Sequence, residues 1–93
     1  MDAKAAVRIA KQYVLDLFEE EKISGLGLEE VALDEATGVW QITLGFFRDR
    51  DERWNDTISA ISSVLSRARV YKVVRISDTS EHVLSVKNRE VME

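Results

Sequence analysis

The stretch "DEATGVWQITLGFF", residues 34–47, decides the fold that this chain can adopt. From Val39 onward, large apolar side chains alternate with smaller or polar ones, which is the period-two pattern of a β-strand with two different faces. One face carries four large apolar side chains, those of Trp40, Ile42, Leu44 and Phe46. Such a face needs an apolar layer to cover it. The residues "DEATG" before the strand predict a short turn in which Gly38 takes a positive φ.

The covering layer is predicted at the N-terminus, as a helix over residues 3–22. Asp2 is a suitable N-cap, and the segment is rich in alanine and contains no glycine or proline. We expect this helix to pack on the large apolar face of the strand, with Leu17 and Ile42 buried. The following "SGLG" is expected to end the helix, with Gly25 in a left-handed position. The predicted apolar stripe recurs at spacings of three and four and consists of Ala6, Ile9, Ala10, Tyr13, Leu17 and Phe18.

The remaining segments predict three more strands and a second helix. "LEEVALD" (residues 28–34) pairs with the central strand in a first hairpin, and "RVYKVVRIS" and "HVLSVKN" form a second hairpin that turns at "DTSE". "WNDTISAISSVLSRA" (residues 54–68) has helical spacing of its apolar residues. We therefore predict a single domain, residues 1–93, of the α+β class. It is a four-stranded antiparallel sheet with the N-terminal helix packed on one face, in the order α-β-β-α-β-β.

Composition argues against several classes of function. The chain has no cysteine, one histidine and a net charge of −4, so we expect no thiolate or multi-histidine metal site, no cofactor and no catalytic centre. Alternation would send Glu29 and Glu30 to opposite faces, "GLG" at residues 25–27 lacks the spacing of a phosphate-binding loop, and His82 reads as an exposed turn residue. No apolar run is long enough to span a membrane, and the charged N-terminal sequence is unlike a secretory signal, which predicts a cytoplasmic protein.

The helix sequence "AAVRIAKQYVLDLF" followed by "VALDEATGVWQITLGF" resembles the small PepSY-like and cystatin-like domains. In those domains an N-terminal helix packs across an antiparallel sheet, so the resemblance implies the same fold. PepSY domains are associated with inhibition of peptidases and usually lie outside the cytoplasm. The resemblance implies no particular functional residue in this chain.

The first candidate site is the charged, aromatic segment that follows the central strand. Phe47 should face away from the core, and "RDRDER" (residues 48–53) then leads to a second tryptophan. Aromatic residues and arginine are enriched where proteins bind one another. We expect a small non-catalytic protein-binding or regulatory module, of the inhibitor, immunity or self-associating type, whose partner is another protein or a second copy. The candidate partner-binding residues are Phe47, Arg48, Arg50, Arg53 and Trp54.

A second candidate surface lies on the third strand, where strict alternation puts Arg69, Tyr71, Val73 and Arg75 on one face. Arginines with an aromatic residue could contact phosphates and stack bases, so the alternative function is a nucleic-acid-binding module that uses Arg69, Tyr71 and Arg75. The net negative charge weighs against it, and an acidic protein segment is the favoured ligand of this row. A third alternative is a small-molecule site in the cleft between the helix and the sheet.

Overall fold

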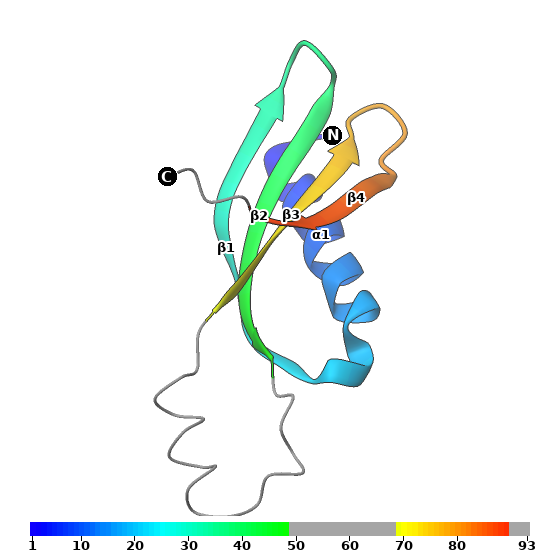
Figure 1. The fold of residues 1–93 in the computed structure, drawn as a ribbon. Helices are drawn as coiled ribbons and strands as arrows, with labels where there is room; N and C mark the ends of the chain where they lie inside the picture. Colours follow the sequence, from blue (N-terminus) through cyan, green and yellow to red (C-terminus); the bar gives the residue numbers. More distant parts are fainter. Residues whose placement is uncertain (49–68, 90–93) are drawn as a thin grey trace, which may run out of the picture.

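The computed structural model describes residues 1–48 and 69–89, and it shows one helix packed across a four-stranded antiparallel sheet (Figure 1). The strands lie in the order β1-β2-β3-β4. The predicted α+β class and antiparallel sheet are confirmed. The second predicted helix, residues 54–68, lies outside the described residues. The elements are α1 (Ala3–Leu17), the short 3₁₀ helix η1 (Glu19–Glu21), β1 (Ile23–Asp34), β2 (Val39–Arg48), β3 (Val70–Ser77) and β4 (Val83–Asn88).

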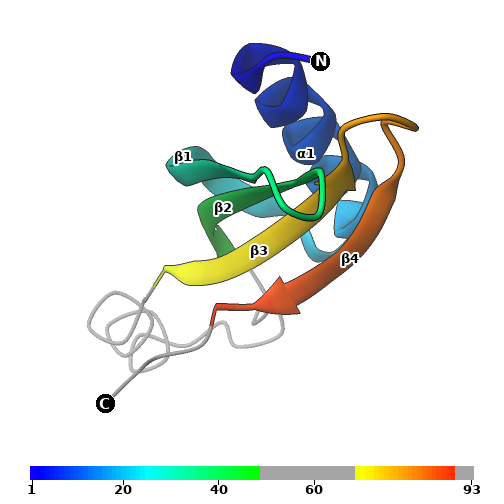
Figure 2. The same ribbon diagram turned by 90° about the horizontal axis from the view of Figure 1, so that it is seen from above.

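The core lies between α1 and one face of the sheet. Figure 2 shows from above that α1 lies on one side of the strands. β2 supplies the predicted row of large side chains, and all four are buried. Two residues of β3 extend this row, because Val74 pairs with Ile42 and Ile76 pairs with Trp40, and side chains directly opposite each other share a face. The prediction that this face forms the main core is therefore confirmed.

The helix meets the sheet through small side chains. The Asp2 side chain caps α1 by accepting a hydrogen bond of 2.8 Å from the Ala5 N–H group. Ala6, Ala10 and Val14 follow each other at intervals of four residues and are fully buried. This line of short side chains lets the helix backbone lie close to the bulky residues of β2.

Two residues of the predicted stripe are exposed, and Ile9 and Phe18 are only partly buried. The side chains of Tyr13 and Leu17 are 41% and 53% exposed, so the prediction that Leu17 belongs to the core was wrong. Both residues lie on the helix line next to the one that faces the sheet. The spacing of three and four residues identified the correct side of the helix. The prediction nevertheless included large side chains of the neighbouring line, whereas the line that faces the sheet consists of small ones.

The helix is also shorter than predicted, and Gly25 does not end it. α1 stops at Leu17, before three glutamates whose charge is unfavourable at a helix C-terminus. These glutamates form η1, and Lys22 then takes the left-handed conformation with φ 49°. Gly25, with φ 65°, lies inside β1 at an irregularity in the pairing with β2, so its positive φ serves a bulge in the strand.

The two hairpin turns are joined to each other. Gly38 has φ 67°, as predicted, and its N–H group donates to the Asp34 carbonyl at 2.8 Å. Its own carbonyl accepts from the N–H group of Asp78, in the other turn, at 2.9 Å. The Asp78 carboxylate also accepts a hydrogen bond of 2.8 Å from the Trp40 indole, and this bond lowers the pKa of Asp78. Asp78 therefore connects the β3–β4 turn to the first hairpin.

Replacing Ile42 with alanine should destabilise the protein by about 2–5 kcal/mol, because it removes buried methyl groups and leaves a cavity. The measurement is the free energy of unfolding in urea. Leu84→Ala is the matched control, since that leucine is 55% exposed on β4 and its truncation should have little effect. Equal losses of stability for the two variants would contradict the assigned core.

Replacing Gly38 with valine should cost about 1–2 kcal/mol, which is the penalty of a left-handed residue with a β-carbon. A β-carbon at Gly38 would meet no atom within 4 Å, so the cost arises from the backbone angle alone. Gly38→Asn should lose less, since asparagine tolerates this region better. Thermal unfolding of both variants checks the prediction, and a valine variant as stable as the asparagine variant would refute it.

Candidate functional site: the outer face of the sheet

The candidate site is the sheet face that points away from α1, which we call the outer face. In the ladder between β2 and β3, Gly45 pairs with Tyr71, Thr43 with Val73, and Gln41 with Arg75. Along each strand these residues alternate with the core residues, so their side chains point to the opposite side of the sheet. β4 adds Ser85 opposite Arg75 and Lys87 opposite Val73.

Arg69 lies on the outer face near the C-terminal end of β2, where its side chain contacts three groups. Its Nη2 donates a hydrogen bond of 2.7 Å to the Gly45 carbonyl and lies 3.6 Å from a carboxylate oxygen of Glu29. Its guanidinium carbon is 5.1 Å from the centre of the Phe47 ring, within the range of a cation–π contact. A β-carbon on Gly45 would come within 2.9 Å of the Arg69 guanidinium and 3.0 Å of the Tyr71 ring. The absence of a side chain at Gly45 therefore leaves the space that both side chains occupy.

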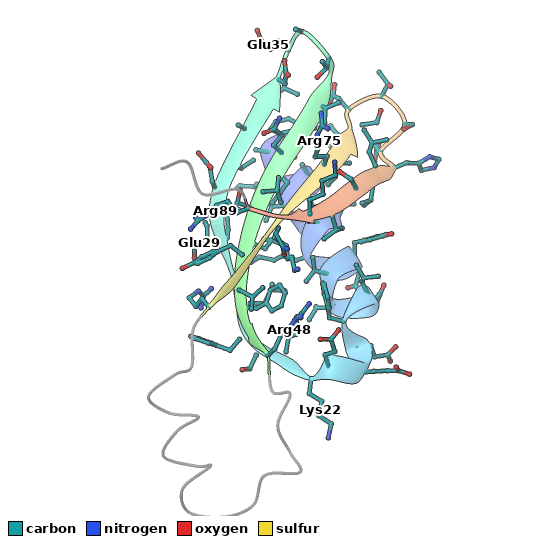
Figure 3. All side chains as sticks on the ribbon, in the orientation of Figure 1. Lys22, Glu29, Glu35, Arg48, Arg75 and Arg89 are labelled. Carbon is teal, nitrogen blue, oxygen red and sulfur yellow. The ribbon has the colours of Figure 1, made fainter. Side chains whose placement is uncertain are left out.

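A second arginine–aromatic pair lies beside the first. The guanidinium carbon of Arg89 is 4.0 Å from the centre of the Tyr71 ring, and the Arg89 N–H group donates to the Tyr71 carbonyl at 3.2 Å. Figure 3 labels Arg89, Arg75 and Glu29 and shows that they come from different strands of the sheet or their ends. Together with Lys87, these residues give the outer face four cationic side chains, those of Arg69, Arg75, Lys87 and Arg89.

The charges of this face are unevenly divided. Within residues 1–48 and 69–89, Glu29 is the acidic residue within ion-pair distance of one of the four cations, namely Arg69. Glu30, which pairs with Thr43, also belongs to the outer face. The prediction that Glu29 and Glu30 point to opposite faces was wrong, because the pairing of β1 shifts between Leu28 and Glu30 and interrupts the alternation. The face is consequently acidic along β1 and basic along β3 and β4.

The structure separates the first set of predicted site residues. Phe47 faces away from the helix, as expected, and lies on the outer face next to Arg69. Arg48 points to the helix side instead: its guanidinium carbon is 4.8 Å from the Phe18 ring centre, and its Nε is 3.3 Å from a Glu21 carboxylate oxygen. The other predicted residues, Arg50, Arg53 and Trp54, lie outside the described residues.

The second predicted set comes together as expected. Tyr71 and Arg75 share the outer face with Val73, and Arg69 joins them immediately before β3 begins. Lys72 lies on the helix side, 5.7 Å from the Phe18 ring centre, where burial and the nearby charge of Arg48 lower its pKa. The sequence reasoning missed Lys87 and Arg89. Alternation along "HVLSVKN" would have placed Lys87 with Arg75 once the pairing of β4 with β3 was known.

The described residues contain no group of three or more histidine or acidic side chains that could hold a metal ion. His82 is exposed between β3 and β4, and Gly25 and Gly27 lie within β1. In the same part of the chain, no helix has the length and apolar character needed to cross a membrane.

The chain was compared with protein families, curated proteins and solved structures. No protein-family description, no curated protein and no solved structure matches the chain. The PepSY-like and cystatin-like resemblance stays a prediction from the sequence.

Replacing Gly45 with alanine should displace Arg69 and Tyr71 and cost about 1 kcal/mol, the lower end of the range for overpacking, because both obstructing groups are side chains that can move. The sharper readout is the NMR signal of the Arg69 guanidinium, which should lose the ring-current shift caused by Phe47. Gly27→Ala is the matched control: Gly27 pairs with Gly45 across the ladder, but a β-carbon there would meet Nη2 of Arg69 at 3.5 Å, an ordinary van der Waals contact that should leave Arg69 in place. An unchanged Arg69 signal in Gly45→Ala would contradict the arrangement.

Proposed function

We propose that this chain is a small non-catalytic protein-binding module whose outer face binds an acidic segment of a partner protein. One observation carries the proposal: two guanidinium groups are stacked on aromatic rings of this face, next to Arg75 and Lys87. A stacked arginine has already lost part of its side-chain freedom, so it loses less when it forms a new hydrogen bond. Its planar array of N–H donors matches the two oxygens of a carboxylate.

The direction of the charge gradient supports an acidic ligand with a defined position. Arg75, Lys87 and Arg89 lie on or beside β3 and β4, whereas Glu29 and Glu30 lie on β1. An acidic segment would be attracted to the β3–β4 side and repelled from the β1 side. The same cations along β3 and β4 would disfavour binding of a basic segment there.

Nucleic acid is the second candidate, favoured by the presence of two rings, Phe47 and Tyr71, on a basic face. The geometry of the outer face disfavours nucleic acid. Each ring already has a guanidinium group 4.0–5.1 Å from its centre, so a base would have to displace an arginine in order to stack. The chain as a whole also carries a net charge of −4, which opposes binding to a phosphate backbone.

The regulatory type of module and its cellular location are further parts of this proposal. An inhibitor, an immunity protein or a self-associating subunit would each need one specific binding face of this kind. Cell fractionation tests the proposed cytoplasmic location.

The test compares an octaglutamate peptide with a single-stranded oligothymidylate of eight nucleotides at the same ionic strength. Lys87→Glu reverses a charge on an exposed residue of β4. It should weaken peptide binding by about 1 kcal/mol, or about fivefold. The dissociation constant is measured by fluorescence anisotropy with labelled ligands.

Lys11→Glu is the matched control, because it makes the same change of net charge on α1, on the other side of the sheet and outside the outer face. It should leave the dissociation constant of the peptide nearly unchanged. Tighter binding of the oligonucleotide than of the peptide would favour the second candidate. Equal effects of the two substitutions, or no measurable binding of either ligand, would refute the outer face as the site.

A further inference from the structure

A groove lies between α1 and β1, on the opposite side of the sheet from the outer face. Its volume is about 370 Å³, and it is largely open to solvent. Its apolar part comes from both elements, and two cationic side chains of α1 border it. The lining residues are Ala3, Lys4, Val7, Arg8, Leu28 and Val31.

The strand that forms one wall of this groove is the first strand of the sheet. Within residues 1–48 and 69–89, β1 pairs with β2 on one side only. The backbone groups on the other edge of such a strand can pair with an additional strand. From Leu28 to Leu33 this edge also presents apolar side chains on the helix side, with Leu28 42% exposed and Leu33 38% exposed.

The charges on the two faces beside this edge are opposite. Lys4 and Arg8 lie one helical turn apart at the groove, on the helix side. Glu29 and Glu30 lie on the outer side. The side chains of a strand added next to β1 would alternate between these two environments. Every second residue of the added strand would enter the groove, which has apolar walls and two cations. The residues between them would lie beside the carboxylates of Glu29 and Glu30.

We propose that β1 binds an extended peptide segment of a partner protein by adding it as a further strand, with alternate side chains in the groove. The segment has apolar and acidic residues at the positions that face α1 and basic residues at the positions between them. This site is separate from the basic part of the outer face, which lies along β3 and β4, because it uses the edge of β1, the groove on the helix side, and Glu29 and Glu30 beside that edge.

The charge pattern disfavours a second copy of β1 as the added strand. The outer-side residues of β1 include Glu30 and Asp34, which pair with Thr43 and Val39. Pairing two copies of β1 would bring these acidic rows next to each other, and like charges on adjacent strands are destabilising. A heterologous segment with basic residues on that side has no such penalty.

The experiment uses the full chain and two synthetic peptides of identical composition. The first, KVKLKEK, has the proposed alternation, and the second, KKKKVLE, has the same net charge without it. Hydrogen–deuterium exchange should show slower exchange of β1 amides between Leu28 and Asp34 with the first peptide only. Leu28→Lys should weaken its binding at least about fivefold, because it places a cation in the apolar groove.

Leu84→Lys is the matched control, since Leu84 is a comparably exposed leucine on the opposite edge strand, and it should bind the first peptide as the unchanged chain does. Arg8→Glu should weaken binding of this peptide, whereas Lys87→Glu should not. Equal binding of both peptides would overturn the proposal. So would protection of β4 in place of β1, or an unchanged affinity in a folded Leu28→Lys variant. Sodium decanoate provides a further test. If it binds at Val7 and Leu28 without displacing the first peptide, the groove is a site for small amphipathic carboxylates and the proposal is overturned.

Discussion

The packing of the four large side chains of β2 on the Ala6–Ala10–Val14 line of α1 is the constraint on which the rest of the structure depends. Because the helix contributes short side chains at this contact, the bulk needed to fill the core comes from the sheet. β2 is bordered by β1 and β3, so every other strand is positioned relative to this contact. With one face of the sheet committed to the helix, the alternate side chains of β2 and β3 must point outward. The outer face is therefore a direct product of the core.

The sequence predicted the parts of this fold that depend on regular alternation. The buried row of β2, the positive φ of Gly38 and the shared face of Tyr71 and Arg75 all follow from a period of two or from turn chemistry. The failures occur where regularity breaks. Gly25 was assigned to a helix end because a glycine after a helix usually has that role, whereas here it permits a bulge in β1. The face of Glu29 was misassigned for the same reason.

The candidate site was harder to predict than the fold, because it depends on which strands are neighbours. Arg69 and Phe47 come from different candidate sets in the sequence, and only the sheet order brings them together. Arg89 follows the last strand and has no local feature that marks it, yet it stacks on Tyr71. Gly45 illustrates the same limit. In the sequence it is a glycine that weakens a strand, and in the structure it makes room for Arg69.

The bond between Trp40 and Asp78 has a consequence for the behaviour of the protein in acid. The hydrogen bond from the indole stabilises the charged carboxylate and lowers its pKa, so the folded protein is favoured when Asp78 is ionised. This contribution is fully present above the pKa that aspartate has in the unfolded chain, about 3.9, and it disappears as the pH falls through the lower pKa of the folded state. Protonation would weaken the link between the two hairpin tips, which Asp78 joins through its side chain and its backbone. Mild acid should therefore leave the two hairpins coupled, and only strongly acidic conditions should let their tips separate.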